Sequence, residues 1–136
     1  MGKGAFVTIS NCSWAEVSVG YYGFDCMYED GQEGSDFGPI TSSSLEPGSE
    51  LPSPGGSQYI EAKSSGPCAS TPSTFVMNMH SINGSDATFH FAESNGTWKV
   101  NGGPYSRISA SGVNFSVVIA HNGVSNSQDV ITVVIS

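Results

Sequence analysis

The stretch STFVMNMHSINGSDATFHFAESNGTWKVN, residues 73–101, determines the fold class of this chain. Two runs of alternating apolar residues flank the pair Asn83-Gly84. If the runs pair with Phe75 opposite Phe91, all their apolar side chains lie on one face. The apolar pairs are then Phe75 with Phe91, Met77 with Phe89 and Met79 with Ala87. This register needs an odd loop, most simply 82–84, in which a type I turn is followed by a left-handed glycine.

A second turn extends the same surface. A two-residue type I′ turn at Asn95-Gly96 pairs Phe91 with Val100 and Glu93 with Trp98. The apolar face begun by Phe75 therefore continues across a third strand. So much aromatic surface on one face must be covered, and this predicts a second layer of strands.

At 136 residues, the chain is long enough for one domain with its own core, and we expect a single domain over 1–136. No window shows sustained helical periodicity, so the predicted fold is all-β, a two-layer antiparallel β-sandwich without substantial helix. Two runs that are apolar on both faces are expected to be interior strands. The strands predicted outside the opening stretch are 5–10, 16–21, 57–62, 113–120 and 130–135. Proline- and serine-rich segments at 38–56 and 64–73 are expected to be loops or irregular edges.

The formal net charge is −8, which disfavours binding to nucleic acid or to anionic lipid through basic residues. No apolar run reaches the roughly 20 residues of a membrane helix, and we recognise no signal peptide. The expected location is therefore open: the cytosol, a mature secreted form, or release by lysis or an unconventional route.

The chain has three cysteines, an odd number without the Cys-x-x-Cys spacing of a metal site. We expect Cys12, Cys26 and Cys68 to be reduced thiols. A single bridge between Cys12 and Cys26 is the alternative, because these two would flank one hairpin.

Candidates for catalysis or metal binding are few. His80 and His90 share the polar face of the predicted hairpin about two rungs apart, and His121 is distant in sequence. Five carboxylates also cluster in the sequence, at Asp25, Glu29, Asp30, Glu33 and Asp36, without the spacing of a calcium loop. None of the common catalytic or phosphate-binding motifs occurs. We therefore predict no enzyme activity, no metal site and no cofactor.

Aromatic residues concentrate near the amino end. Because Tyr21 and Tyr22 are consecutive, they must point to opposite faces of a strand. At least one of them is then exposed, together with neighbouring rings. Such rings suit either stacking on sugars or insertion among lipid headgroups. The predicted ligand-binding residues are Trp14, Tyr21, Tyr22, Phe24 and Tyr28, in a cluster that extends to Phe37.

The order of segments resembles a known family. These segments are AFVTISNCSWAEVSV (5–19), SLEPGSEL (44–51), STFVMNMH (73–80), ATFHFAES (87–94), TWKVNG (97–102) and a valine-rich final strand. In this order the chain resembles the aegerolysins, small acidic β-sandwich proteins, and the small component of binary insecticidal crystal toxins. Trp98, Val100 and Gly102 match the family's Trp-x-Val-x-Gly strand. The segment YYGFDCMYEDG (21–31) stands where the family has Trp-Gly-Lys, so no lipid-contact residue carries over.

The resemblance implies recognition of membrane lipid, often in sphingolipid-rich membranes, and pore formation together with a larger partner protein. Our first hypothesis is therefore a membrane-lipid-binding, cytolytic or insecticidal toxin component that acts through the aromatic cluster. The alternative is a lectin that holds a glycan with the same aromatic residues. A third hypothesis is a homo-oligomer in which the valine-rich C-terminal strands pair across subunits.

Overall fold

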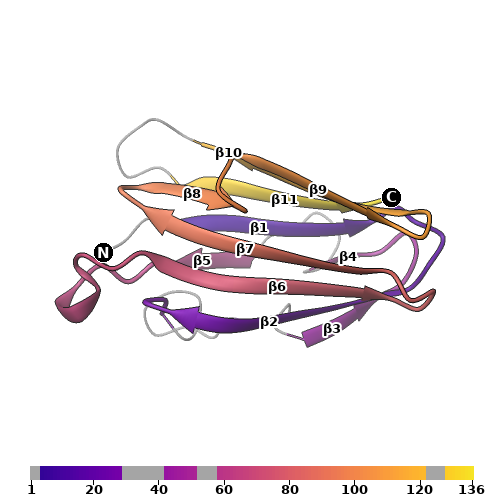
Figure 1. Cartoon of the computed structure of the whole chain (residues 1–136), viewed down its shortest axis with the longest axis horizontal. Coiled ribbons are helices and arrows are strands. Elements are labelled where there is room, and N and C mark those ends of the chain that lie inside the picture. The colour runs from indigo at the N-terminus through magenta and orange to yellow at the C-terminus, as the bar shows by residue number, and fades with distance from the viewer. Residues whose placement is uncertain (1–3, 29–41, 52–57, 122–127) are drawn as a thin grey trace.

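The computed structural model describes residues 4–28, 42–51, 58–121 and 128–136, and these residues form an all-β fold of two stacked sheets (Figure 1). A short 3₁₀ turn, η1 (Gly66–Cys68), accompanies the strands. The strands are β1 (Gly4–Asn11), β2 (Val17–Asp25), β3 (Ser42–Leu45), β4 (Glu50–Leu51), β5 (Gln58–Glu61), β6 (Ser73–Ser81), β7 (Asp86–Ser94), β8 (Thr97–Val100), β9 (Tyr105–Ala110), β10 (Val113–Ala120) and β11 (Asp129–Ile135).

The two sheets differ in how the chain builds them. The first has the order β4-β1-β11-β10-β9, with β5 also paired to β1, and the second has the order β3-β2-β6-β7-β8. Within the described residues, all ladders are antiparallel except that between β1 and β11. The predicted two-layer β-sandwich is confirmed, and this one parallel ladder is the exception to its antiparallel pairing. β1 and β11 come from opposite ends of the chain, so no hairpin forces them to run in opposite directions.

The hairpins at 73–101 have the predicted register. Phe75 pairs with Phe91 across β6 and β7, and Phe91 pairs with Val100 across β7 and β8. The turn glycine Gly84 has φ 93°, and both Asn95 and Gly96 have positive φ, as the two turn types require. The chemistry of the turns and the apolar alternation thus agree with the observed register.

The core lies between the sheets and is built from the alternate residues of each strand. Phe75 stacks on Phe91 with ring centroids 4.8 Å apart and meets the edge of Trp98 at 5.7 Å. Pairs of this kind each contribute about 0.5–1.5 kcal/mol beyond the area they bury. Trp98 is 1% exposed, which confirms its predicted place in the core.

Other predicted strands also have the expected inward residues. Val7, Ile9, Val17 and Val19 are buried, and β10 and β11 lie inside the first sheet, as predicted. Their second apolar face is open, however. Val118 and Val130, on this outer face, remain 47% and 42% exposed.

The segments predicted to be irregular contain two strands. β3 pairs with β2 and β4 pairs with β1, inside the region 38–56 that was expected to form loops or irregular edges. β9 was not predicted at all. β3 and β9 are terminal strands of their sheets, and β4 pairs at the free edge of β1. Edge strands of this kind carry few of the apolar residues that reveal interior strands in a sequence.

Candidate functional site

One end of the sandwich is organised by a single buried asparagine. Asn11 is 1% exposed, and its amide nitrogen donates hydrogen bonds to the carbonyls of Ala15 and Leu45, each at 2.8 Å. Its side-chain oxygen accepts from the backbone N–H of Ser13 at 3.0 Å and from the Ser13 hydroxyl at 2.6 Å. Both donor positions and both acceptor positions of the amide are thus used. The loop between β1 and β2 is therefore held in one conformation.

This loop presents Trp14 to solvent. The Trp14 side chain is 67% exposed and Ile82, in the β6–β7 turn, is 74% exposed. They are the two most exposed large hydrophobic side chains among the residues that the structure describes. The N–H of Ile82 donates to the carbonyl of Glu16 at 2.9 Å, so the two turns lie side by side. We call Trp14, Ile82 and the turns that carry them the apolar tip.

The β6–β7 turn is also tied to the opposite sheet. Asn83 donates from its amide to the carbonyl of Ser111 in the β9–β10 turn at 3.1 Å. The hydroxyl of the buried Ser85 donates to the carbonyl of Ala110 at 2.7 Å. These bonds connect the turns of the two sheets at the end where Figure 1 marks the C terminus. The apolar tip therefore rests on a rigid support.

The other predicted aromatic residues lie away from this tip. Tyr22 and Phe24 are 52% and 40% exposed and belong to the far half of β2, and Phe24 stacks on Phe75 at 6.2 Å. From the start of β2 to Phe24 the strand advances by about 20 Å. Trp14 and Phe24 therefore occupy opposite ends of the sandwich. The predicted aromatic cluster does not form one surface.

Two of the predicted residues are not free surface groups. Tyr21 is packed in the core, where its ring centroid lies 5.6 Å from that of Phe75, and burial raises the pKa of its phenol. This position removes Tyr21 from any contact surface. Tyr28 is half-buried, with the Lys63 ammonium 6.0 Å from its ring centroid. Phe37 lies outside the described residues.

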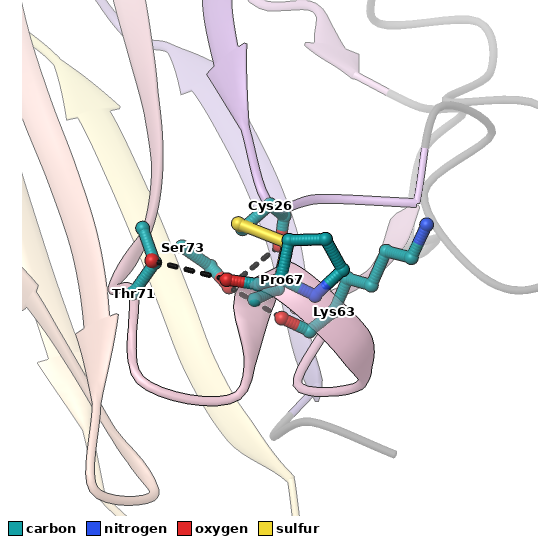
Figure 2. The surroundings of a disulfide bond; sticks show 6 residues. Cys26, Lys63, Pro67, Thr71 and Ser73 are labelled. Atoms are coloured by element: carbon teal, nitrogen blue, oxygen red, sulfur yellow. Dashed lines mark hydrogen bonds between the residues drawn. A yellow bond between two sulfur atoms is a disulfide. The ribbon is translucent and has the colours of Figure 1, made fainter.

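The opposite end of the sandwich is fastened by a disulfide between Cys26 and Cys68 (Figure 2). The hydroxyl of Ser73 donates to the carbonyls of Cys26 and Lys63 beside the bridge, at 2.6 and 3.4 Å. The expectation of reduced thiols is confirmed for Cys12 and wrong for Cys26 and Cys68, and the alternative Cys12–Cys26 bridge is also wrong. Cys12 lies at the apolar tip, at the far end of β2 from Cys26, and it is the one exposed, free cysteine among the three.

A polar cavity of about 350 Å³ adjoins this disulfide. One wall is the η1 segment and the other is the β7–β8 turn. Glu93 is 9% exposed, and its carboxylate accepts a hydrogen bond from the N–H of Gly96 at 3.1 Å. The lining residues that carry polar side chains are Lys63, Ser64, Ser70, Thr71, Glu93, Ser94 and Asn95. This site could not be predicted from the sequence, because its two walls are about 30 residues apart in the chain.

The histidines do not meet. His80 bonds Asp86 on the outer face of the second sheet, and His90 lies on the same face two rungs away, as predicted. His121 bonds the buried Asp129 at 2.9 Å. Within the described residues, no group of three possible metal ligands comes together. Of the acidic cluster, Asp25 is exposed at the end of β2, and the other four carboxylates lie outside the described residues.

Comparison with known proteins assigns no family. No family model matches the chain, and no curated protein matches its sequence. The part of the chain that the structure describes contains no helix with the length and apolar character needed to cross a bilayer.

Sequence reasoning identified Trp14 but missed its neighbour Ile82. A signal was present, since Ile82 occupies a turn position where Pro, Asp or Ser is usual. A branched apolar side chain at such a position has no place in a core. Exposure of Ile82 could therefore have been expected from the sequence, and the side chain is 74% exposed.

Proposed function

We propose that this protein binds membrane surfaces through the apolar tip and serves as the lipid-binding component of a cytolytic or insecticidal complex. The observation that carries the proposal is the rigid display of Trp14 and Ile82 at one end of the sandwich. The two side chains are exposed, and the hydrogen bonds of the buried Asn11 hold the loop that carries Trp14 in place. An indole ring partitions favourably into the lipid headgroup region because it is apolar and carries one polar N–H.

The charges favour neutral headgroups as the target. The chain carries a net charge of −8, and Glu16 and Glu46 are exposed near the tip. Anionic lipid would repel such a surface. Zwitterionic lipid would accept the two apolar side chains without that penalty, which agrees with the sphingolipid-rich membranes that the aegerolysin resemblance implies.

The size of the tip predicts weak attachment by one copy. Transfer of Trp14 and Ile82 out of water supplies about 3–6 kcal/mol. Immobilising the protein at the membrane offsets part of this gain. A single tip therefore binds reversibly, and stable attachment needs several tips or a partner protein.

Tryptophan fluorescence tests the proposal, because the chain has two tryptophans and Trp98 is buried. Vesicles of phosphatidylcholine, with and without sphingomyelin, should shift Trp14 emission to the blue and protect it from an aqueous quencher. Sedimentation with the same vesicles should show at least about tenfold weaker binding for Trp14→Ala and for Ile82→Ser. Tyr22→Ala, at the far end of β2, is the matched control. Undiminished binding by both tip variants would refute the proposal.

The cytolytic part of the proposal has its own test. Two side chains at the tip are enough to dock but not to open a bilayer, so we expect binding without leakage by this protein alone. Vesicles loaded with a dye should release it only when a larger pore-forming protein is added. Release by this protein alone would show that no partner is required.

A second candidate function is glycan binding in the polar cavity. The favouring observation is its lining of hydroxyl, amide, carboxylate and ammonium groups, which are the groups that hydrogen-bond sugar hydroxyls. A volume of about 350 Å³ is also within the range of small-ligand sites. A glycan array without lipid tests this function. Binding that Glu93→Gln and Ser94→Ala abolish, and that Trp14→Ala preserves, would favour the lectin.

A further inference from the structure

The outer face of the first sheet is unusually apolar. Among the described residues, eight large hydrophobic side chains are strongly exposed, and four of them lie on this one face. They come from β1, β9, β10 and β11 and are Phe6, Tyr105, Val118 and Val130. We call this surface the apolar face. An apolar patch shared by four strands is a feature of interaction sites.

The ladder registers arrange the apolar face in rows across the sheet. One row runs Tyr59, Phe6, Val130, Ala120. The next runs Thr8, Thr132, Val118, Tyr105. Phe6 and Tyr59 also touch, with ring centroids 5.3 Å apart. These two rows contain no charged residue, so the middle of the face can lose its water at little cost.

A third row carries one charge at each end. It runs Glu50, Ser10, Val134, Ser116, Arg107, from β4 to β9. The hydroxyl of Ser10 donates to Glu50 at 3.4 Å, and Arg107 donates to the side-chain oxygen of Asn114 at 3.0 Å. The negatively charged Glu50 therefore lies at one edge of the sheet and the positively charged Arg107 at the other. The three rows together are electrically neutral in a chain whose net charge is −8.

We infer that the apolar face is the interface with a second copy of this chain, related by a two-fold axis parallel to the strands. Such an axis places β9 of one copy over the β4 edge of the other and keeps each row opposite itself. Glu50 then faces Arg107 of the second copy, and the pair occurs twice. Val130 and Val118 pack near the axis. Two acidic copies can approach along these three rows because the rows are neutral, and Glu61, which accepts a hydrogen bond from Tyr59 at the end of β5, is buried.

The dimensions of the face suit a dimer of modest stability. Five neighbouring strands at about 4.8 Å spacing, over about six residues of length, cover roughly 600 Å² per copy once side-chain relief is included. Two copies thus bury on the order of 1,200 Å², the lower end of specific interfaces. A lipid surface fits this face less well, because it has no pair of opposite charges at the positions that would face Glu50 and Arg107.

This geometry differs from pairing of the C-terminal strands across subunits. β11 already pairs with β1 on one side and with β10 on the other, so it has no open edge for another copy. β10 likewise lies between β11 and β9, so the proposal does not use edge-to-edge pairing of these strands. Packing of faces leaves every ladder intact.

The same axis has a consequence for membrane binding. A rotation about an axis parallel to the strands leaves their direction unchanged, so both apolar tips point to the same side of the dimer. Two tips on one side give bivalent attachment. This consequence rests on the proposed function, whereas the dimer itself does not.

Sedimentation velocity over a range of protein concentrations, without lipid, tests the dimer. We expect the wild type to associate to twice the monomer mass and Val118→Glu to remain a monomer, with an unchanged circular dichroism spectrum. Arg107→Glu and Glu50→Arg should each weaken the dimer at least tenfold, because each puts like charges opposite each other twice. Thr88→Glu, on the outer face of the second sheet, is the control and should dimerise normally.

The charge swap excludes a folding defect as the cause. The double variant Glu50→Arg with Arg107→Glu should recover the dimer that each single variant loses. A wild type that stays monomeric at all concentrations would overturn the inference, as would a dimer that Val118→Glu leaves intact or a swap that fails to recover it. Vesicle binding by Trp14→Ala is measured separately, so failure of the membrane proposal and failure of the dimer are distinguishable.

Discussion

The two ends of the sandwich are held together by different means. At the apolar tip the connections are tight turns, and the hydrogen bonds of Asn11 and Ser85 tie them to their neighbours. At the other end the chain makes a long excursion between β5 and β6, and a disulfide fastens it. A tight turn has little conformational entropy to lose on folding, so hydrogen bonds are enough to hold it in place. A long connection has more freedom, and a covalent bond restricts it far more effectively.

Loss of the disulfide should have the largest effect on stability. Cys26 and Cys68 are 42 residues apart, and the chain-entropy model gives about 4 kcal/mol for closing a loop of that length. Cys26→Ser with Cys68→Ser should lower the free energy of unfolding in urea by about 2–4 kcal/mol. Cys12→Ser, at the exposed thiol, is the control and should change it by less than about 0.5 kcal/mol. Equal stability of all three proteins would show that the bridge does not fasten this end.

At the tip, the equivalent change is Asn11→Ala. It removes four hydrogen bonds and leaves the buried carbonyls of Ala15 and Leu45 without that partner, so we expect a loss of about 2–3 kcal/mol. Ser13→Ala removes a smaller part of the network and should lose about 1 kcal/mol. Thermal or urea unfolding measures both. The Asn11→Ala protein should also bind vesicles more weakly although Trp14 is present, because the tip is no longer rigid. Vesicle binding equal to wild type would contradict the role given to the network.

Substitution of two glycines by alanine compares a crowded position at the disulfide end with an open position in β2 of the second sheet. A Cβ on Gly4 would collide with the ring of Tyr59, whereas a Cβ on Gly20 meets nothing within 4 Å. Gly4→Ala should displace the ring and cost about 1–2 kcal/mol. Gly20→Ala should be neutral or stabilise the strand by up to about 1 kcal/mol. Urea unfolding measures the stability of both variants. A Gly4→Ala protein more stable than the Gly20→Ala protein would contradict the prediction.

The smallest expected effect on stability comes from the ionisation of Tyr59, the side chain that lies against Gly4. Burial, the nearby Glu61 carboxylate and the hydrogen bond from Tyr59 to Glu61 raise the pKa of Tyr59 to about 12 from the ordinary 10.0. The neutral phenol is therefore favoured in the folded state. Its contribution to stability is complete below pH 10 and is lost as the pH rises toward 12.

Tyrosinate absorbance followed against pH measures this step, and the difference between wild type and Tyr59→Phe assigns it. Glu61→Gln should lower the midpoint, because it removes the negative charge beside the phenol. A midpoint that does not move would show that burial alone raises the pKa.

Much of the second sheet was predictable because its information is local. The pairing of Phe75 with Phe91 follows from the alternation of neighbouring residues and from Asn83-Gly84, and all of these lie within one hairpin. The burial of Trp98 follows in the same way from Asn95-Gly96. Trp14, which was predicted as part of an exposed contact surface, is indeed exposed.

The remaining features depend on contacts between distant parts of the chain. The partner of Cys26 could not be read from spacing, because the long excursion before β6 brings Cys68 back to it. The predicted aromatic cluster treated neighbours in sequence as neighbours in space. A strand separates such residues by about 3.3 Å each, so Trp14 and Phe24 ended up at opposite ends.

The sequence by itself determined the fold class, the hairpin register and the buried face, because alternation and turn chemistry act over a few residues. Only the tertiary structure decided the disulfide, the pairing of Trp14 with Ile82, the polar cavity and the rows of the apolar face. Each of these joins segments tens of residues apart. Their proximity depends on how two sheets stack and on the parallel pairing of β1 with β11, which no local pattern encodes.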